Sequence, residues 1–415
     1  MNIKDYAAME ERCSNCSYCK FIPFDKVKSA RFSECCPSIG YYNFNTYSAR
    51  GRFQLGLAVG RGELEATDEN ARLIHTCLSC GACDVSCKVC RYNLEPLEHN
   101  IALKEEAIKQ NGPLPAQARM LASLKTEKTL LPGMKKQNRM DWTEGLEFSG
   151  ESETLFFPGC KYSYTPALRK TVRRIVEVLT KAGGKMAYLG NGDICCAGRL
   201  YQMGLVEEFE ERAKLNIKLL KSKNYKMIVT PCSDCYHAFK RLYAKLGLEI
   251  EVLHAVEYLD RLISKGAVKF TKELPLQVTY HDPCHLGRQG EPYVYWDGHE
   301  KKILNQVHTW EPRRPRYNGA YGIYDAPRRV LKAIPGLQLI EMERIREYSW
   351  CCGAGGGCSE TDPEMSKWTA SERIAEARAT EAKVLVTACP WCKSNFDAVG
   401  GIEVADLFDL VALAL

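Results

Sequence analysis

The chemistry of this chain is carried by its cysteines, of which there are 21 among 415 residues. Thiolates at short, regular intervals are the ligands that iron–sulfur clusters use. Two groups come early in the chain: Cys13, Cys16 and Cys19, followed by Cys77, Cys80, Cys83 and Cys87. Two later groups share a longer rhythm of a single cysteine, a Cys-Cys pair and a C-x-x-C: Cys160, Cys195, Cys196, Cys232 and Cys235, then Cys284, Cys351, Cys352, Cys389 and Cys392. This usage predicts a chain that carries electrons.

The early groups have the spacing of cubane 4Fe–4S sites. A C-x-x-C-x-x-C run holds three corners of one cluster, and a cysteine three residues further on binds the second cluster of a pair. The second group keeps this spacing, with Lys88 in place of the usual proline, whereas the first has Pro23 where its fourth cysteine is expected. We therefore predict these ligand sets: Cys13, Cys16, Cys19 and Cys87 for cluster I, and Cys77, Cys80, Cys83 and Cys36 for cluster II.

Two alternatives remain open for these groups. Cys35 precedes Cys36 directly and is the alternative fourth ligand of cluster II. A structural zinc site also favours four thiolates. The spacing of the second group is the iron–sulfur form, so the zinc alternative applies mainly to the first group.

The later groups lie in an internal repeat that begins near residue 151. TLFFPGC and QVTYHDPC open the two halves, and KMIVTPCSDC and KVLVTACPWC close them. Between them lie stretches with apolar residues every three or four positions, such as ALRKTVRRIVEVLTKAG and DAPRRVLKAIPG. Short buried strands that alternate with such helices predict two similar α/β domains, each with a small, mainly parallel sheet. The cysteines that directly follow predicted strands should meet at one edge of each sheet: Cys160, Cys232, Cys284 and Cys389.

The predicted organisation has four parts: a two-cluster domain over 1–110, a connector over 111–150, and α/β domains over 151–275 and 276–415. The connector contains proline, glycine and charge without sustained periodicity, so we expect it to wrap around a neighbouring domain. Between Cys284 and its Cys-Cys pair lies an extra segment, about 290–320, rich in tryptophan and arginine. That segment is either a docking site for a partner or a surface excursion packed by its own aromatic residues.

Charge and hydropathy say less about function than the cysteines do. The net charge is +6, and basic clusters at 135–139 and 313–316 either steer an acidic partner or are solvated loops. No nucleic-acid-binding signature is present. The first residues, MNIKDYAAMEER, lack a signal-peptide pattern, and no run approaches a membrane span. VADLFDLVALAL, at the end of the sequence, is interrupted by Asp406 and Asp409 and is expected to form a buried helix. We therefore expect a cytoplasmic protein with reduced cysteines, which favours metal ligation over disulfides.

The repeated motif resembles a known family. A cysteine, a Cys-Cys pair and a C-x-x-C form the CCG cysteine-rich domain of heterodisulfide reductases, which also occurs in iron–sulfur subunits of glycolate oxidase and anaerobic glycerol-3-phosphate dehydrogenase. The likeness rests on YHDPCHLGR, YDAPRRVLKAIPG, CCGAGGG and VLVTACPWC, and on YSARGRFQLG (47–56). It implies an α+β, largely helical ferredoxin-like domain with two clusters, followed by two α/β CCG domains with small parallel sheets.

The resemblance also implies cofactors at the paired cysteines. In this family each CCG motif can bind a noncubane 4Fe–4S cluster through five cysteines, and some members hold an ordinary cluster or zinc at one of the two sites. The implied ligand sets are Cys160, Cys195, Cys196, Cys232 and Cys235 for cluster A, and Cys284, Cys351, Cys352, Cys389 and Cys392 for cluster B. Ala197 follows the first pair where the family has glycine, and it is expected to crowd a backbone turn.

Several residues lie beside these motifs without a ligand role. The cysteines left over are Cys35, Cys90 and Cys358; spectators, substitute ligands and reactive thiols are the alternatives, and we favour the first two because free buried cysteine is common. The GAGGG stretch at 353–357 follows a Cys-Cys pair rather than a strand, so it is interpreted as a close backbone approach to the cluster and not as a dinucleotide site. Three histidines lie near ligand cysteines and could donate protons or hydrogen bonds: His237, His281 and His285.

The favoured function is electron transfer within a multi-subunit anaerobic oxidoreductase. The chain would pass electrons between a flavoprotein or ferredoxin partner and a terminal reductase, and a flavin-containing heterodisulfide-reductase-like subunit is the expected partner because the chain lacks a flavin motif. One candidate assembly is the ATP-independent benzoyl-coenzyme A reductase complex. The alternatives are a disulfide reductase acting at a noncubane cluster and a zinc-stabilised scaffold. No catalytic residue is assigned.

Overall fold

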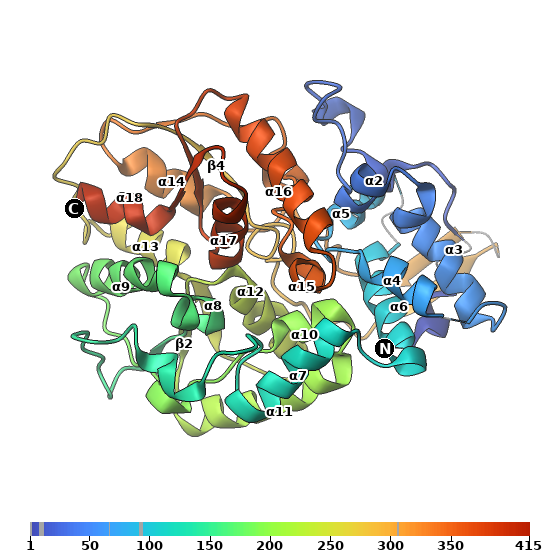
Figure 1. Ribbon diagram of the computed structural model, residues 1–415, viewed down its shortest axis with the longest axis horizontal. Coiled ribbons are helices and arrows are strands. Elements are labelled where there is room, and N and C mark those ends of the chain that lie inside the picture. The colour runs from blue at the N-terminus through green and yellow to red at the C-terminus, as the bar shows by residue number, and fades with distance from the viewer. Residues whose placement is uncertain (1, 8–11, 66, 91–93, 305–306) are drawn as a thin grey trace.

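The computed structural model describes residues 2–7, 12–65, 67–90, 94–304 and 307–415. Among the described residues of the first module, the regular elements are all helices, joined by loops and one isolated β-bridge between Phe21 and Glu34 (Figure 1). Its short 3-10 helices are η1 (Ile3–Tyr6), η2 (Tyr18–Lys20), η3 (Phe24–Lys26) and η4 (Asn45–Tyr47). Its α-helices are α2 (Pro37–Tyr42), α3 (Ala49–Gly60), α4 (Asp68–His75), α5 (Ala82–Cys90) and α6 (Pro96–Asn111).

The connector over 111–150 is more regular than expected. It contains a 13-residue helix, α7 (Pro115–Glu127), and the 3-10 helix η5 (Lys136–Met140). Proline in the first turn starts α7, as it does α6, because the missing N–H of proline would have no partner inside the helix at that position. The basic cluster at 135–139 was expected at the surface, but Arg139 is buried. The connector therefore contributes to the interior of the first α/β domain.

The first α/β domain has a three-stranded parallel sheet in the order β1-β2-β3. Its strands are β1 (Thr154–Phe156), β2 (Met227–Thr230) and β3 (Glu251–His254). Its helical elements are α8 (Gly159–Tyr164), α9 (Pro166–Lys181), η6 (Gly190–Gly192), α10 (Gly198–Met203), α11 (Val206–Ser222), α12 (Ser233–His237), the π-helix η7 (Ala238–Tyr243) and α13 (Ala255–Ser264). Ala187 adds a single parallel bridge beside β1 at Leu155.

The second α/β domain repeats this plan with a four-stranded parallel sheet in the order β7-β4-β8-β9. Its strands are β4 (Gln277–Tyr280), β7 (Gln338–Leu339), β8 (Val384–Thr387) and β9 (Glu403–Asp406). Its helical elements are α14 (Asp325–Ala333), η8 (Arg346–Tyr348), η9 (Gly355–Gly357), α15 (Cys358–Thr361), α16 (Pro363–Arg378), α17 (Pro390–Val399) and α18 (Leu407–Ala414). The order matches the first sheet when the Ala187 bridge is placed opposite β7, which confirms the repeat.

The two α/β domains pack against each other through equivalent helices. Helix α9 of the first contacts α18 of the second, and α13 of the first contacts α14 of the second (Figure 1). Helix α9 corresponds to α14 and α13 to α18, so the interface has an approximate two-fold symmetry. A single hydrophobic core runs through both domains and includes buried residues of β1, β2, β4 and β8.

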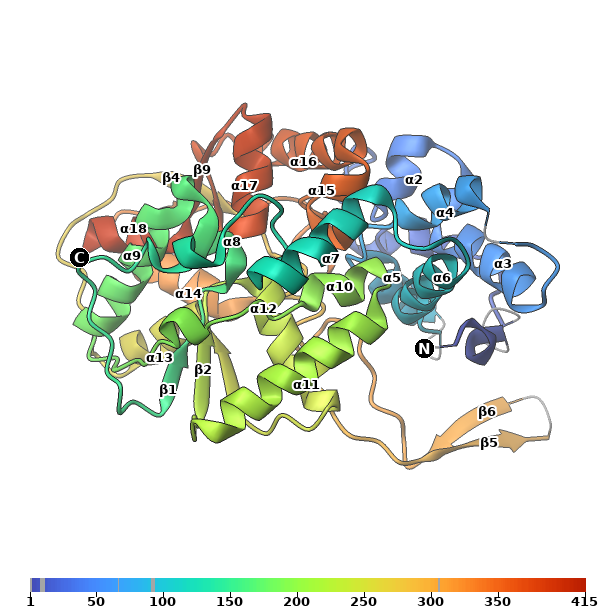
Figure 2. The same ribbon diagram turned by 60° about the horizontal axis from the view of Figure 1, so that its bottom comes forward.

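The segment 290–320 forms an arm with its own antiparallel hairpin. Strands β5 (His299–Ile303) and β6 (Val307–Glu311) pair with each other and with no other described strand. Figure 2 shows the hairpin projecting from the body on the side of the first module. The structure does not distinguish a docking site for a partner from a surface excursion, and both interpretations remain predictions.

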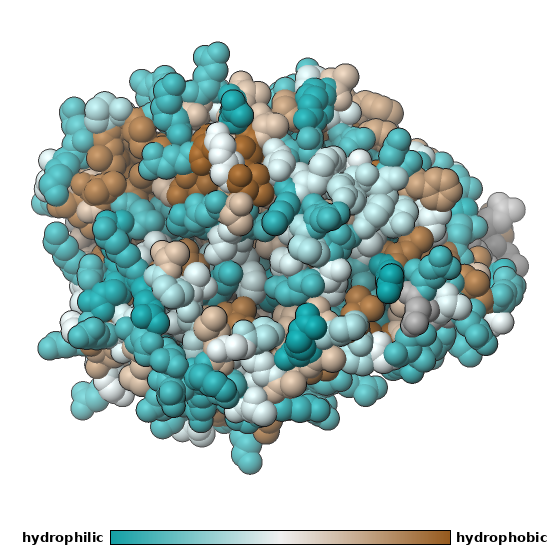
Figure 3. All heavy atoms as spheres, in the orientation of Figure 1, coloured by the Kyte–Doolittle hydropathy of each residue, from teal (hydrophilic) through white to brown (hydrophobic). Residues whose placement is uncertain are grey.

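In the described part of the chain, no helix combines the length and apolar character needed to cross a membrane. The face drawn in Figure 3 is largely hydrophilic, with apolar side chains in several separate groups. Separate exposed apolar groups are normal for a globular surface. Helix α18 has its buried residues in the shared core, as expected for the last stretch of the sequence, although that stretch begins as strand β9.

Candidate iron–sulfur sites

The second paired-cysteine site lies where β4 and β8 end. Its five cysteines are all buried, with exposed fractions of 9% or less, and they are Cys284, Cys351, Cys352, Cys389 and Cys392. Cys351 is within hydrogen-bonding reach of Cys284 and Cys352, and Cys392 is within reach of both Cys352 and Cys389. One linked group of thiols therefore includes all five residues that the resemblance implied for cluster B.

The first paired-cysteine site has the same arrangement at the ends of β1 and β2. Cys195 contacts Cys160 and Cys196, and the Sγ atoms of Cys196 and Cys235 lie 3.4 Å apart. Cys235 also reaches Cys232. The residues implied for cluster A are thus gathered into one buried group, in the order expected from the repeat: Cys160, Cys195, Cys196, Cys232 and Cys235.

Backbone geometry brings these thiols to the amino ends of helices. Cys232 directly precedes α12 and Cys389 directly precedes α17, while Cys160 lies in the first turn of α8. The amino end of a helix lowers the free energy of a nearby thiolate, which is the form that binds metal. A parallel strand that ends in a helix therefore positions these three ligands. The pKa of Cys160 is raised by its contact with Cys195 and by burial, and burial raises the pKa of Cys232.

A left-handed residue follows each Cys-Cys pair. Gly353 has φ +88° and Ala197 has φ +57°, so both positions use a backbone conformation that glycine adopts most readily. The turn directs the N–H of Gly353 at Cys351 Sγ over 3.4 Å and the N–H of Ala197 at Cys195 Sγ over 3.3 Å. The expected crowding at Ala197 is thus a real strain in the turn, and the turn nevertheless forms.

The early cysteines separate into two groups. Cys87 is close to Cys13, Cys16 and Cys19: its pKa is raised by burial first, then by Asp84 and by these thiols. Cys16 is exposed and Cys13 is partly buried, whereas Cys19 and Cys87 are buried. The four residues predicted for cluster I therefore lie together, with one edge of the group open to solvent.

Cys36 lies with the second early group, consisting of Cys77, Cys80 and Cys83. Burial, with smaller contributions from Cys80 and Cys77, raises the pKa of Cys36 to about 12, and Cys83 has Cys36 as its first electrostatic neighbour. The neighbouring Cys35 instead directs its thiol at the carbonyl oxygen of Cys19, 3.4 Å away. The placement favours Cys36 over Cys35 as the fourth member of this group.

The remaining cysteines differ from these groups. Cys358 is fully buried and directs its thiol at the carbonyl oxygen of His75 over 3.4 Å, which is the behaviour of a protonated thiol. The side chain of Cys90 lies outside the described residues. All twenty described cysteines are free thiols.

The second early group touches the second paired site directly. Cys80 is within hydrogen-bonding reach of Cys351, and both belong to one buried cluster with Cys284. Arg288 lies beside all three thiols and donates from Nε to the carbonyl oxygen of Cys80 over 2.7 Å. Glycines of the 353–357 stretch make this approach possible, since a methyl group at Gly355 or Gly356 would collide with the backbone of residues 77–78.

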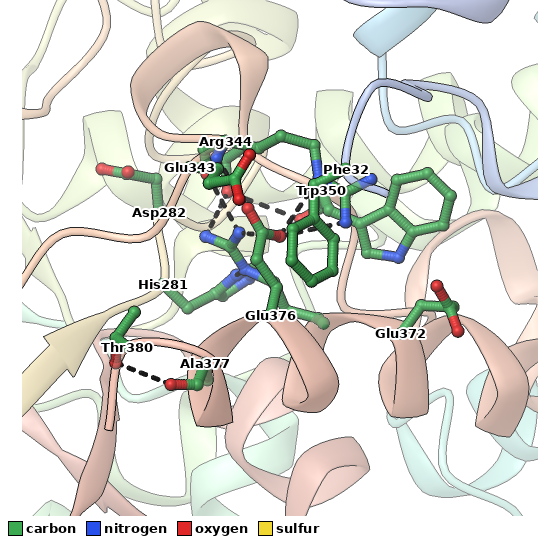
Figure 4. A network of polar contacts seen from close by, with 12 residues as sticks. Phe32, His281, Asp282, Glu343, Arg344, Trp350, Glu372, Glu376, Ala377 and Thr380 are labelled. Atoms are coloured by element: carbon green, nitrogen blue, oxygen red, sulfur yellow. Dashed lines mark hydrogen bonds and ion pairs between the residues drawn. The ribbon is translucent and has the colours of Figure 1, made fainter. Parts of the chain in front are cut away.

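Of the three histidines, His281 faces the second paired site. Its ligand atom lies within 4.8 Å of those of Cys352 and Cys392. Arg373 donates from Nε to His281 Nδ1 over 3.2 Å, which leaves Nε2 to carry the proton and point at Cys352. Arg373 also pairs with Glu376 at 2.6 Å. Arg344 contacts the same carboxylate, as Figure 4 shows. Burial lowers the pKa of His281, which favours the neutral ring.

His285 and His237 connect the two α/β domains. His285 Nδ1 lies 2.6 Å from Asp234 Oδ1, so the residue after Cys284 pairs with the C-x-x-C of the other repeat. His237 stacks on His285 with ring centroids 5.0 Å apart and bonds the carbonyl oxygen of Gln289. At the equivalent place in the first repeat, Lys161 lies over the ring of Trp391 at 4.8 Å. The two sites thus share the arrangement of their cysteines but differ in the side chains beside them.

Sequence reasoning missed four buried cations around the sites. Arg139 directs its guanidinium at Cys160 Sγ over 3.8 Å and pairs with Asp193 at 2.9 Å. Lys104 donates to the carbonyl oxygens of Cys77, Gln202 and Gly356, joining all three parts of the chain. The other two are Arg288 and Lys88. Of these four residues, only Lys88 was noticeable in the sequence, because it stands where the iron–sulfur pattern usually has proline.

The thiol groups fit iron–sulfur clusters. Two sets of four and two sets of five cysteines are gathered, and soft thiolate ligands in such numbers suit iron–sulfur clusters or zinc. The cations and backbone N–H groups directed at the sulfur atoms would offset the negative charge of bound clusters. Two parallel α/β domains, each with a cysteine group at one sheet edge, define a tandem cysteine-rich iron–sulfur protein.

Comparison with known proteins agrees with this class. The cysteine-rich domain called CCG matches residues 154–240 and 314–397. A subunit of the dihydromethanophenazine:CoB–CoM heterodisulfide reductase of Methanosarcina mazei is 32% identical over 372 residues, 86% of this chain and 81% of that protein. The probable iron–sulfur-binding oxidoreductase FadF of Bacillus subtilis is 29% identical over 399 residues, and EtfAB:quinone oxidoreductase of Syntrophomonas wolfei is 28% identical over 351. The alignments include 51% and 44% of those two longer proteins.

The chain belongs to the family of CCG-domain iron–sulfur proteins that includes this heterodisulfide reductase polypeptide. Its relatives are oxidoreductases, and this chain is an iron–sulfur oxidoreductase subunit of the same kind. The predicted family and the two CCG domains are confirmed, and so is the largely helical character of the first module.

Proposed function

We propose that the chain is the electron-transfer subunit of a multi-subunit anaerobic oxidoreductase. It passes electrons between a flavoprotein or ferredoxin partner and a terminal reductase. The observation that carries this proposal is the contact between Cys80 of the first module and Cys351 of the second CCG domain. That contact joins the early cysteines to the paired cysteines without an intervening layer of protein.

The proposed ligands are those predicted from the sequence. Cluster I would be held by Cys13, Cys16, Cys19 and Cys87, and cluster II by Cys36, Cys77, Cys80 and Cys83. Clusters A and B would be held by the five-cysteine groups of the first and second CCG domains, with zinc at one of them as the variant known from the family. When bound, such clusters supply one-electron redox chemistry. The proposed domains are 1–110, 111–150, 151–275 and 276–415.

The protein's own residues bury, orient and charge-balance these sites. Arg288 fixes the backbone at Cys80 and lies beside Cys351, so it holds the two thiol groups in contact. Lys104 ties the Cys77 loop to both CCG domains. Arg139 provides a positive charge beside Cys160. These contacts fix distances between sites and keep water away from the buried thiols.

The partner in this proposal is a flavin-containing heterodisulfide-reductase-like subunit or a ferredoxin. The names of two relatives, EtfAB:quinone oxidoreductase and the heterodisulfide reductase polypeptide of Methanosarcina mazei, support a role inside a redox assembly. The ATP-independent benzoyl-coenzyme A reductase complex is the candidate assembly, and a reducing cytoplasm is the proposed compartment.

A second candidate is disulfide reduction at the second paired site. His281 faces Cys352 and His285 lies beside Cys284, whereas the first repeat has Phe157 and Lys161 at the equivalent positions. Histidine side chains therefore lie beside Cys284 and Cys352 but not beside Cys160, and an imidazole can exchange protons near neutral pH. This difference favours the second site for chemistry that consumes protons. Disulfide-dependent oxidation of the reduced protein, without any partner present, would favour this candidate over pure electron transfer.

The test is the iron, acid-labile sulfide and zinc content of anaerobically purified protein, combined with low-temperature EPR during a reductive titration. About sixteen irons per chain would support four 4Fe–4S clusters. About eight irons would restrict electron transfer to the first module, and stoichiometric zinc without iron would establish the scaffold alternative instead.

Substitution of Cys352 by serine tests the second paired site separately. Cys352 contacts both Cys351 and Cys392, so its loss removes the central thiol of the group. We expect the Cys352→Ser protein to lose or convert cluster B while cubane signals stay intact. Unchanged iron and sulfide content with unaltered spectra would contradict the ligand assignment.

A further inference from the structure

The early cysteine group around Cys87 is the most exposed of the four. Cys16 is the exposed cysteine among the twenty described, and Cys13 beside it is partly buried. The cysteines of the two CCG groups are buried, and so are Cys80 and Cys83, whereas Cys36 and Cys77 are partly buried. An electron that enters from another protein therefore has its shortest route through the loop at Cys13–Cys16.

The arm formed by residues 290–320 is anchored beside that loop. Arg12, directly before Cys13, pairs with Glu300 of β5 at 3.1 Å. The fully buried Lys88 donates to the carbonyl oxygen of Tyr317 over 2.8 Å, and Arg316 returns a hydrogen bond to the carbonyl oxygen of Lys88 over 3.0 Å. The arm is thus fastened to the first module by contacts that include the residue following Cys87.

The hairpin of this arm is not part of the domain that carries it. The sheet of the second CCG domain is built from β7, β4, β8 and β9. Strands β5 and β6 pair with no other described strand, and they project from the body in Figure 2. Packing of the sheet therefore does not require the hairpin.

The exposed surface of the arm is basic with apolar side chains at its tip. Residues 299–316 contain five lysines and arginines against two glutamates. Ile303, Leu304 and Val307 are 46%, 89% and 55% exposed. Trp310 and Arg313 line a cavity of about 340 Å³ at the base of the hairpin. Apolar contacts inside a charged rim are typical of protein interfaces, and the charge selects an acidic partner.

We propose that the arm and the Cys13–Cys16 loop together form the docking surface for an acidic ferredoxin. This proposal rests on the proposed electron-transfer function. The reduced ferredoxin would give up one electron at this surface, and a cluster held by Cys13, Cys16, Cys19 and Cys87 would accept it, with no bond or proton moving at the contact. The ferredoxin is preferred over a lipid surface because the arm is fastened to the one exposed ligand loop, where electron exchange is shortest.

The experiment measures electron transfer from a reduced, acidic two-cluster ferredoxin to the full-length protein by anaerobic stopped flow. The test variant is Lys302→Glu/Arg313→Glu, at two exposed positions of the arm. The matched control is Lys135→Glu/Lys136→Glu, with the same charge change at exposed positions of the connector. Iron content and reduction by dithionite are measured for each protein, and ferredoxin binding is measured separately by calorimetry.

At low ionic strength we expect the arm variant to have a second-order rate constant roughly tenfold lower, with a matching loss of affinity. The control should change less than about twofold, and the difference should shrink as salt screens the charges. Equal effects of both variants, or none, would overturn the docking proposal. A vesicle result would also overturn it. If the wild type and the control bind anionic phosphatidylglycerol vesicles and the arm variant does not, the arm is a membrane contact.

Two further results distinguish a failure of the docking proposal from a failure of the electron-transfer function on which it rests. If dithionite or an acidic flavodoxin reduces the wild type but the ferredoxin does not, the docking proposal fails and electron transfer stands. If no reductant reduces the iron-loaded protein, the proposed function itself fails.

Discussion

At the scale of single residues, two adjacent cysteines have opposite environments. Cys36 directly precedes α2 and lies among Cys77, Cys80 and Cys83, whereas Cys35 bonds the carbonyl oxygen of Cys19. Both are cysteines in the same turn, so their spacing alone left the choice open. The orientation of each side chain supports Cys36 as the proposed ligand, and the two positions give a pair of matched variants.

Serine at each of these positions should therefore have different effects. Cys36→Ser should remove or convert cluster II, because that group would keep only three of its thiolates. Cys35→Ser should leave the iron content unchanged, because a hydroxyl can make the same hydrogen bond to Cys19. Iron analysis and EPR of the two proteins check this, and a loss of iron only in the Cys35 variant would reverse the assignment.

At the scale of elements, the turn after each Cys-Cys pair sets the local backbone. Both turns need a left-handed residue, and the second repeat meets this need with Gly353 and the first with Ala197. Their surroundings differ. A methyl group at Gly353 would collide with the carbonyl oxygen of Ser366 and lie 2.8 Å from Asn395 Nδ2.

Gly353→Ala and Ala197→Gly should accordingly shift stability in opposite directions. The left-handed conformation costs an alanine about 1–2 kcal/mol relative to glycine. Gly353→Ala adds a steric collision and should lower the free energy of unfolding by more than about 2 kcal/mol. Ala197→Gly should leave it unchanged or raise it by up to about 1 kcal/mol. Denaturant unfolding of the two variants measures this, and equal destabilisation would contradict the strain argument.

The elements also show where sequence reasoning succeeds. The short apolar runs before Cys160, Cys232, Cys284 and Cys389 predicted buried parallel strands, and each is one. Patterning worked there because a buried strand and the helix after it are local in sequence. The connector helix α7 and the role of Arg139 were missed because they depend on contacts made after folding. Arg139 resembles its exposed lysine neighbours until Asp193 and Cys160 surround it.

At the scale of the whole molecule, a buried polar contact joins the two CCG domains. The Tyr162 hydroxyl of the first donates to Asp406 Oδ2 of the second over 2.6 Å. Burial is the main reason that the pKa of Asp406 is raised to about 7, with Asp409 adding to it. The folded protein therefore holds a proton on this carboxyl at a pH where the unfolded chain has lost it.

The raised pKa of Asp406 makes the free energy of unfolding depend on pH. Between about pH 4 and the folded pKa of about 7, the folded state binds more protons than the unfolded state, so this group makes stability fall as pH rises. Asp406→Asn does not titrate, so its stability should change less over that window. Tyr162→Phe removes a hydrogen bond that lowers this pKa and should move the dependence to higher pH. Unfolding measured at several pH values checks both, and parallel curves for all three proteins would contradict it.

The contact between Cys80 and Cys351 also bears on how the protein is made. These residues are about 270 positions apart in the chain, yet each is buried against the other. The ribosome releases the first long before the second. A cluster placed at this junction would have to enter before the two halves close, or after the contact has opened locally. Its insertion would then be coupled to the packing of the first module against the second CCG domain.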